Sequence, residues 1–297
     1  MRLLLIGGSG QVGRELRELS VARNVALVAP SRAELDLTDA TAVTRVFEAG
    51  PWGAVINAAA YTNVDRAESE ESAAFAANAE GPARLAIETA RCGIPLVHIS
   101  TDYVFDGRKG APYVEGDVVS PLNVYGRSKR AGEERIGAAN PRHVILRTAW
   151  VYSPFGNNFV RTILRLAAER DRLTIVADQR GCPTAASDVA RACLDVALLC
   201  AEQRERMSYG IYHLAGAGEA TWYDFARAII ERVGGRLGKT PEVIPIKTSD
   251  YPTAAVRPAD TRLDCGAIGR AFGIALKSWP QALEATLDRL IVNKGVS

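Results

Sequence analysis

Two polar side chains four residues apart, Tyr125 and Lys129, have the types and spacing to do chemistry together. Four residues are just over one turn of a helix, so both side chains leave the same helix face and can act on one bound molecule. A phenol has a reference pKa of about 10, and a nearby ammonium lowers that pKa by favouring the phenolate. The pair can therefore serve as a tuned proton donor, although the same spacing also occurs by chance on solvent-exposed helices.

The helix that must position this pair is expected within the stretch SPLNVYGRSKRAGE, residues 120–133. Pro121 suits the entry of a chain into a helix, and Arg130 and Glu133 keep the following turn polar. A fourth-strand residue completes the set. Thr101 follows a strand expected at residues 96–100, and its hydroxyl is well placed to donate a hydrogen bond to a carbonyl oxygen. A hydroxyl, a phenol and an ammonium together suit the reduction of a ketone.

The first residues predict a phosphate-binding turn between a strand at 3–6 and a helix at 10–19. The glycines between them read either as Gly-x-x-Gly-x-x-Gly, beginning at Gly7, or as Gly-x-Gly-x-x-Gly, beginning at Gly8. Either pattern gives a tight turn, a backbone without side chains and free helix amides for a pyrophosphate. Since the motif follows a strand and opens a helix, we expect a dinucleotide site. Its residues here are Gly7, Gly10, Gln11, Val12 and Gly13.

The residues after a second strand, expected at 25–29, select the dinucleotide. An arginine there attracts the 2′-phosphate of NADPH, whereas a carboxylate binds the free 2′-hydroxyl of NADH. Arg32 follows the strand and favours NADPH, while Glu34 and Asp36 lie near the usual distance and keep NADH possible. Thr38 is expected to cap the next helix. We assign to this side of the cofactor site Ser31, Arg32, Asp36 and Leu37.

A third strand, expected at 54–57, ends in three small residues that leave room for a flat cofactor: Ala58, Ala59 and Ala60. Cofactors of open α/β sheets bind at this carboxyl edge. The segment 65–92 that follows is alanine-rich and polar, and it predicts one helix that is interrupted or bent at Gly81 and Pro82. The three histidines, His98, His143 and His213, lie in strand-like apolar runs and are expected to pack in the core or the sheet.

The alternation of strands and helices predicts an α/β fold, a Rossmann-like doubly wound parallel sheet with a smaller, interleaved α/β substrate lobe. The cofactor domain is expected to comprise residues 1–150 and about 185–215, and the substrate lobe 151–184 and 216–297. Further strands are expected at 143–149, 173–177, 211–215 and 243–246. Further helices are expected at 187–204, 221–233 and 279–291.

Composition narrows the classes of partner. The chain has 297 residues, 47% of them hydrophobic, and a net charge of +2. These values fit an ordinary globular protein and argue against nucleic-acid and membrane-surface binding. The N-terminal apolar run is too short for the core of a signal peptide, and no run approaches the roughly 18 residues of a membrane span. The five cysteines are odd in number and form no Cys-x-x-Cys unit. We therefore expect a cytoplasmic protein with free thiols and a small-molecule substrate.

Several motifs, in this order and spacing, carry a family resemblance: GGSGQVG, NAAAYTNVDRAE, STDYVFDG, YGRSK and RTAWVY. They resemble the extended short-chain dehydrogenase/reductase superfamily and, within it, the dTDP-4-dehydrorhamnose reductase family. The likeness continues through residues 157–159, 178–184 and 257–264, so it spans nearly the whole chain. The superfamily motifs are shared by many enzymes, whereas residues 102–107, 147–152 and 178–184 are more specific.

The resemblance implies reduction of the 4-keto group of dTDP-4-dehydro-6-deoxy-L-mannose to dTDP-L-rhamnose, the last step in making that activated sugar. By similarity, Tyr125 protonates the new alkoxide, Lys129 binds the nicotinamide ribose and lowers the phenol's pKa, and Thr101 holds the carbonyl oxygen. The cofactor implied is NADPH, with NADH possible, and the partner is a nucleotide sugar. The resemblance places at the substrate Thr101, Asp102, Tyr103, Trp150 and Asn158.

Two departures and two alternatives bear on this interpretation. Some relatives bridge a dimer with Mg²⁺ held by carboxylates; Glu15 is present here, but residues 185–188 contain no glutamate, so no metal site is assigned. The protein is expected to be a monomer or a homodimer. The same fold serves as a non-catalytic regulatory subunit of methionine adenosyltransferase, and also in nucleotide-sugar epimerases and dehydratases. A dehydratase needs an acid and base pair beside the threonine, which Asp102 and Tyr103 match imperfectly.

Overall fold

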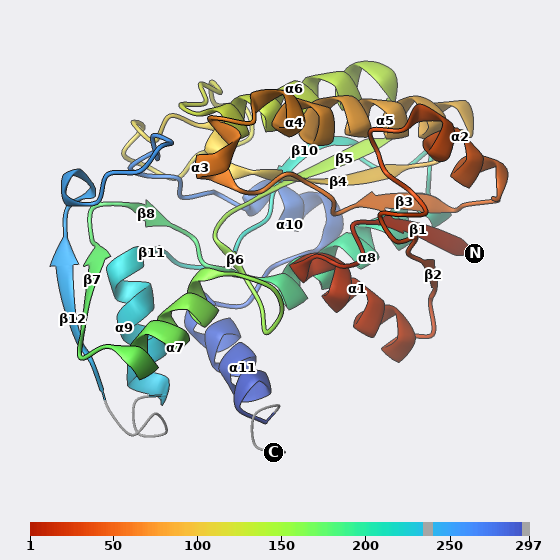
Figure 1. The fold of residues 1–297 in the computed structure, drawn as a ribbon. Coiled ribbons are helices and arrows are strands. Elements are labelled where there is room, and N and C mark those ends of the chain that lie inside the picture. The colour runs from red at the N-terminus through yellow and green to blue at the C-terminus, as the bar shows by residue number, and fades with distance from the viewer. Residues whose placement is uncertain (234–239, 293–297) are drawn as a thin grey trace.

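A parallel sheet of six strands organises the fold in the computed structural model, which describes residues 1–233 and 240–292 (Figure 1). Its strand order is β10-β5-β4-β3-β1-β2, and each neighbouring pair is parallel. From β1 the chain first adds β2 on one side and then β3 on the other. This arrangement confirms the predicted Rossmann-like fold class. The strands are β1 (Arg2–Ile6), β2 (Ala26–Val28), β3 (Ala54–Asn57), β4 (Leu96–Thr101), β5 (His143–Thr148) and β10 (Gly210–His213).

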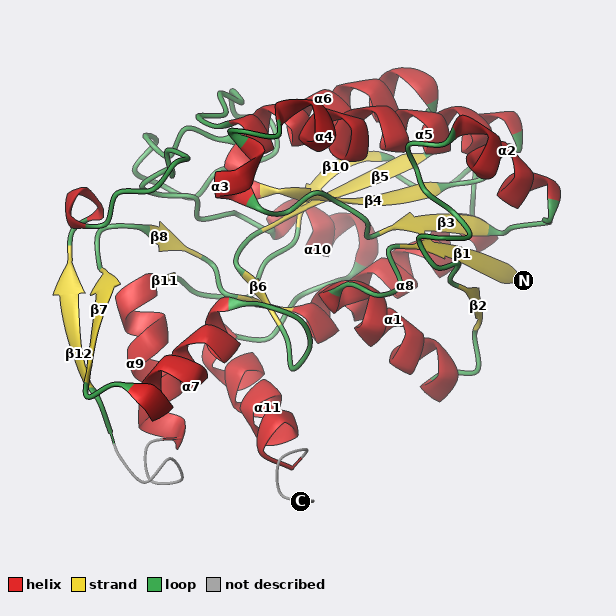
Figure 2. Ribbon diagram, in the orientation of Figure 1, coloured by secondary structure: helices red, strands yellow, loops and turns green. Residues whose placement is uncertain are grey.

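Helices cover both faces of this sheet, as Figure 2 shows. Alternation along β1 explains why: Leu3 and Leu5 face one hydrophobic cluster, while Leu4 and Ile6 face the other. The first cluster packs against α1 (Gln11–Ala22), α8 (Ala186–Glu202) and α10 (Gly266–Phe272). The second packs against α2 (Ala40–Glu48), α5 (Gly81–Arg91) and α6 (Val124–Ala139).

The helix expected over residues 65–92, with its interruption at Gly81 and Pro82, is divided further than predicted. The chain forms α3 (Val64–Ala67), α4 (Glu71–Phe75), a π-helical turn at Ala76–Glu80 and then α5, with Pro82 in the first turn of α5. Asn78 lies in the π turn, where its carboxamide accepts a hydrogen bond from Tyr61 N and donates to Ser128 Oγ of α6. These side-chain contacts belong to the tertiary fold, so helix propensity along the segment could not reveal the wider turn.

A smaller lobe lies beside the sheet (Figure 1). Its parallel pair is β7 (Arg172–Val176) and β12 (Glu242–Ile246), and its helices are α7 (Phe159–Glu169), α9 (Trp222–Val233) and α11 (Trp279–Val292). The remaining short elements are β6 (Val151–Tyr152), β8 (Arg180–Gly181), β9 (Thr184–Ala185), β11 (Ala220–Thr221), and 3₁₀ turns at Asp102–Val104 and Thr248–Asp250. The chain enters the lobe after β5 and returns to the sheet through α8 and β10. The domain bounds given above stay a prediction.

Helix α6 is fastened to the sheet by a buried ion pair. Glu133 of α6 accepts hydrogen bonds from Arg147 of β5 at 2.9 and 2.7 Å, and both side chains are 3% exposed. Ser100 of β4 donates to the same carboxylate at 2.5 Å. At the other end of the helix, the Asn123 side chain accepts from Gly126 N and so caps the first turn. The contacts of Glu133 thus hold the helix that carries Tyr125 against the sheet, and Asn123 caps its first turn.

We expect Glu133→Gln to lower the free energy of unfolding by about 3 kcal/mol or more, because it leaves the buried Arg147 guanidinium without its counter-charge. Glu134→Gln is the matched control on the next residue. It breaks only the exposed pair between Glu134 and Arg130, for which less than about 1 kcal/mol is expected. Urea unfolding of both variants measures the difference, and equal losses would contradict the structural role given to the buried pair.

Candidate active site

The glycine turn between β1 and α1 is shaped for close backbone approach. Gly7 has a φ of +83°, and a Cβ on it would lie 2.5 Å from Ala59 N. A Cβ on Gly13 would overlap the Gly7 carbonyl oxygen. Gly8 has no such positive φ, so the geometry favours the pattern that begins at Gly7. Gly10 is the N-cap of α1 without a side-chain cap, which leaves the helix amides free for a pyrophosphate.

The other residues assigned to the cofactor lie around this turn. Ala58, Ala59 and Ala60 follow β3 at the carboxyl edge of the sheet, and Ala59 packs against the turn at Gly7. The side chains of Val12 and Leu37 are buried in the two hydrophobic clusters, so only their backbone can face a cofactor.

The loop after β2 presents an exposed guanidinium and two carboxylates that accept hydrogen bonds. The Arg32 side chain is 87% exposed, and its Nε lies 3.3 Å from Asp36 Oδ2. Glu34 accepts from Ser31 N at 2.7 Å, and Asp36 accepts from Thr38 N at 2.9 Å and Thr38 Oγ1 at 2.8 Å. Hydrogen bonds to Thr38 hold the pKa of Asp36 below its usual value. Both carboxylates thus complete local turns, while Arg32 can meet a phosphate.

The expected helix cap at Thr38 is wrong. Asp39 is the N-cap of α2, and its side chain accepts from Thr41 N and Ala42 N. Thr38 instead satisfies the carboxylate of Asp36.

The structure brings Thr101, Tyr125 and Lys129 together where β4 ends and α6 begins. Thr101 Oγ1 accepts from Tyr103 N at 3.1 Å and donates to Asp102 Oδ1 at 3.0 Å. The Tyr125 ring packs edge-on against Tyr103, with centroids 5.8 Å apart. Lys129 is 1% exposed, and its Nζ lies 2.6 Å from Ile99 O and 3.2 Å from His98 Nε2.

Burial moves these groups toward their neutral forms. It raises the pKa of Tyr125 to about 12, against the hydrogen bond with Thr101 and with a further increase from the Asp102 charge. Burial also lowers the pKa of Lys129 to about 8, against the charge of Glu133. The expected lowering of the Tyr125 pKa by Lys129 is therefore absent from this structure, where Lys129 points to strand β4.

The two residues after Thr101 are also shielded. Asp102 is 2% exposed, and burial raises its pKa to about 6, although hydrogen bonds with Thr261 and Thr101 oppose the shift. Burial likewise raises the pKa of Tyr103 well above its ordinary value. The carboxyl of Asp102 accepts a hydrogen bond from the Thr101 hydroxyl and so orients it. In this structure Asp102 therefore supports a catalytic residue.

Trp150 and Asn158 are more firmly packed than the sequence indicates. The indole of Trp150 stacks on Trp222 with centroids 3.5 Å apart, and its backbone φ is +46°, a strained value for a large residue. Asn158 caps α7 through Arg161 N and donates to Gln11 Oε1 at 2.9 Å. Asn158 thus links the cofactor helix to the smaller lobe, and Trp222 is a neighbour of the site that sequence reasoning missed.

Comparison with known proteins agrees with this geometry. Residues 1–292 match the family described as RmlD substrate binding domain. The chain belongs to this family. A dTDP-4-dehydrorhamnose reductase of Sinorhizobium fredii is 43% identical over 293 residues, which cover 98% of each chain. The predicted family is therefore confirmed.

Two solved RmlD-family structures share the fold. A dTDP-4-dehydrorhamnose reductase of Clostridium acetobutylicum is 36% identical, with a TM-score of 0.90 over 98% of this chain and all of that one. The Bacillus anthracis enzyme, in complex with NADP, is 32% identical, with a TM-score of 0.89 over 97% of this chain and 99% of that one.

The carboxylate considered for Mg²⁺ has another partner. Glu15 is 5% exposed, and its two oxygens accept from Arg289 Nη1 at 2.8 and 2.9 Å. Within residues 1–233 and 240–292, no cluster of three or more His, Cys, Asp or Glu side chains could hold a metal ion. In the same residues, no helix has the length and apolarity to span a bilayer.

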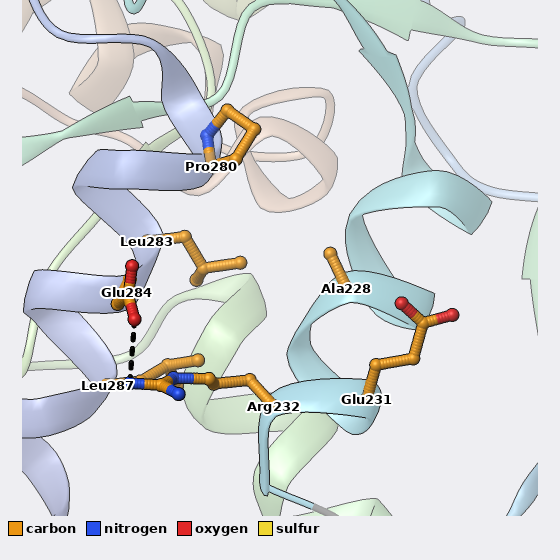
Figure 3. A pocket seen from close by; sticks show the side chains of 7 residues that line it. All are labelled: Ala228, Glu231, Arg232, Pro280, Leu283, Glu284 and Leu287. Carbon is orange, nitrogen blue, oxygen red and sulfur yellow. Dashed lines mark ion pairs between the residues drawn. The ribbon is translucent and has the colours of Figure 1, made fainter.

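A surface hollow lies between α9 and α11 (Figure 3) and is lined by Ala228, Glu231, Arg232, Pro280, Leu283, Glu284 and Leu287. The Arg232–Glu284 ion pair crosses it at 2.8 Å. No residue assigned to catalysis, cofactor or substrate contributes to its wall.

Asp102→Asn is expected to flatten the pH dependence of the unfolding free energy between about pH 4 and 6. Because burial raises the pKa of Asp102, this carboxyl stabilises the fold below pH 4, and about 3 kcal/mol is lost as the pH rises through 6. Asparagine resembles the protonated acid and keeps that contribution at every pH. Urea unfolding at pH 4 and pH 7 compares the two proteins, and parallel pH profiles would show that Asp102 ionises normally.

Proposed function

We propose that this RmlD-family chain reduces the 4-keto group of dTDP-4-dehydro-6-deoxy-L-mannose to give dTDP-L-rhamnose, with NADPH as reductant. The observation that carries the proposal is the meeting of Thr101, Tyr125 and Lys129 at the same sheet edge as the glycine turn. Relatives up to 43% identical over nearly the whole chain bear the name of this reductase. The reaction completes the synthesis of the activated sugar, and we place it in the cytoplasm.

The proposed chemistry follows from the charge that develops on the carbonyl oxygen. When bound, the nicotinamide supplies a hydride to C4 of the sugar. The Tyr125 hydroxyl, and that of Thr101 once its hydrogen turns from Asp102 to the substrate, stabilise the growing negative charge. Such donors bind the transition state better than the ground state. Tyr125 then gives its phenolic proton to that oxygen. Lys129 lies one turn along the same helix face, where we assign it to the ribose of the cofactor.

NADPH is favoured by the charges around β2. The Arg32 side chain is 87% exposed and can turn from its 3.3 Å contact with Asp36 toward a phosphate, while Glu34 and Asp36 already accept from backbone amides. The Bacillus anthracis relative in complex with NADP supports the same cofactor.

For the nucleotide sugar we retain Thr101, Asp102, Tyr103, Trp150 and Asn158 as candidate contacts. Asn158 would need to exchange its bond to Gln11 to reach a ligand, so we rank it last of the five. Trp150 can offer only the indole surface that Trp222 leaves uncovered.

Two alternatives, a regulatory subunit and an epimerase or dehydratase, differ from the reductase in whether they consume NADPH. A non-catalytic regulatory subunit would bind NADPH without consuming it, and the buried, oriented Thr101 and Tyr125 would then have no task. An epimerase or dehydratase would produce no net oxidation of NADPH. A monomer or a homodimer is equally compatible with this site.

Tyr125→Phe is expected to lower turnover by about 10²- to 10⁴-fold, because it removes the proton donor and keeps the ring. NADPH affinity should stay within about twofold. The assay follows NADPH absorbance with the 4-keto-6-deoxy sugar nucleotide, and cofactor binding is measured separately by fluorescence. Tyr209→Phe is the matched control, since it removes a phenol that donates to Arg204 O and belongs to no residue set assigned to the site. Normal turnover in Tyr125→Phe would show that another group is the acid.

Arg32→Ala should weaken NADPH binding about tenfold and leave NADH binding nearly unchanged, because only NADPH carries the 2′-phosphate. Arg45→Ala, which removes an exposed arginine from α2, controls for the loss of surface charge. Dissociation constants for both cofactors at fixed ionic strength test this. An unchanged ratio in Arg32→Ala would remove the arginine from the cofactor site.

A further inference from the structure

A chain of buried polar groups runs behind the catalytic residues. It begins at Ala59 N beside the glycine turn and passes through Asn57 of β3 and His98 of β4 to Lys129 of α6. Asn57 and His98 are 0% exposed, and Lys129 is 1% exposed. The three contacts measure 3.1 Å, 3.0 Å and 3.2 Å in this order. Water cannot compensate a wrongly oriented donor here, so every hydrogen must find an acceptor.

The backbone amide of Ala59 fixes the direction of all three hydrogen bonds. Ala59 N–H can only donate, so the atom of Asn57 that faces it is the oxygen. The NH₂ group of Asn57 then faces Nδ1 of His98, which must accept. An imidazole that accepts at Nδ1 carries its single hydrogen on Nε2. That N–H points at Nζ of Lys129.

A lysine nitrogen accepts this hydrogen only as a neutral amine, because an ammonium has three donors and no lone pair. The second contact of Nζ, the carbonyl of Ile99, takes one amine hydrogen. Neither contact is a carboxylate. Burial already lowers the pKa of Lys129, and an N–H aimed at the nitrogen acts in the same direction.

The other ionisable groups around Lys129 do not reverse this preference. On its own helix, Glu133 favours the ammonium, but its carboxylate is taken by Arg147 of β5 and by Ser100. Burial keeps Tyr125 protonated. Asp102 after β4 is a carboxylate above about pH 6, but it accepts from the Thr101 hydroxyl, and the charge that opposes burial at Lys129 is that of Glu133. Burial lowers the pKa of His98 well below its ordinary value, so the imidazole is neutral.

We propose that Asn57 and His98 are positioning residues that favour the neutral amine of Lys129, so that binding of NADPH at alkaline pH is coupled to uptake of one proton at Nζ. The proton comes from solvent, and the ribose hydroxyl oxygens and the phosphates of the cofactor favour the ammonium that forms. The inference rests on the proposed function in one respect, that Lys129 meets the cofactor. It assigns a role to a histidine that its apolar strand makes look like simple core packing.

The direction of the hydrogen bonds from Ala59 to Lys129 is tested on the protein without cofactor. Ring-¹⁵N histidine NMR from pH 6 to 9 should show His98 protonated at Nε2 and unprotonated at Nδ1. The chain has three histidines, and the signal missing from His98→Gln identifies the right one. A His98 signal with its hydrogen on Nδ1, or an imidazolium, would overturn the proposal without bearing on reductase activity.

The proton uptake is tested by calorimetry of NADPH binding at pH 8.5, in phosphate and in Tris, whose ionisation enthalpies differ. Uptake of roughly one proton is expected, and none in Lys129→Met. Asn57→Asp keeps the shape of the side chain, but its carboxylate accepts from Nδ1–H and turns the Nε2 lone pair toward Lys129. Uptake at pH 8.5 should then fall by at least half.

Equal uptake in the parent and in Asn57→Asp, or none in the parent, would overturn the coupling. If Asn57→Asp does not fold, the histidine spectrum and the Lys129→Met comparison still decide. A protein that takes up the proton but does not reduce the sugar would refute the proposed function and leave this inference intact.

Discussion

The position of the catalytic helix depends on one buried charge pair. Arg147 and Glu133 form a two-point contact between β5 and α6, and Ser100 adds a contact from β4. Residues 125, 129 and 133 recur every four positions, so Tyr125, Lys129 and Glu133 share one helix face. The stripe that an ordinary helix would fill with apolar side chains is polar here, and its last member anchors the first two against the sheet.

Two glycines allow α6 to approach its neighbours closely enough for that anchor to work. A Cβ on Gly132 would overlap the carbonyl oxygen of Asn78 in the π turn, and one on Gly126 would overlap that of Tyr103. Asn78 in turn donates to Ser128. The helix is therefore located by a charge pair on its sheet side and by backbone contact elsewhere, and Thr101 meets Tyr125 because β4 and α6 have little freedom to shift.

The sequence predicts those parts of this arrangement that depend on residues close together in the chain. Apolar runs locate the strands, and the glycines of residues 7–13 identify a turn that only glycine can form. The helix expected over residues 65–92 is more divided than predicted, with a π turn where Asn78 is held by Tyr61 and Ser128, which lie far away in the chain. The hydrogen-bond partners of His98 and Arg147 could not be predicted for the same reason. Each lies in an apolar strand, and its partner is set by how α6 packs.

Burial shifts the pKa values of the candidate site in one common sense. It raises the pKa of Tyr125 and of Asp102 and lowers that of Lys129, so each shift favours an uncharged group. Glu133 and Arg147 are the exception, and their charges cancel within one contact. The poorly hydrated site presents oriented hydroxyl groups, and the Asp102 carboxylate, ionised above about pH 6, accepts from the hydroxyl of Thr101. Negative charge that develops on a carbonyl oxygen is then stabilised more strongly than it would be in water, because the effective dielectric constant is low and the donors are already in place.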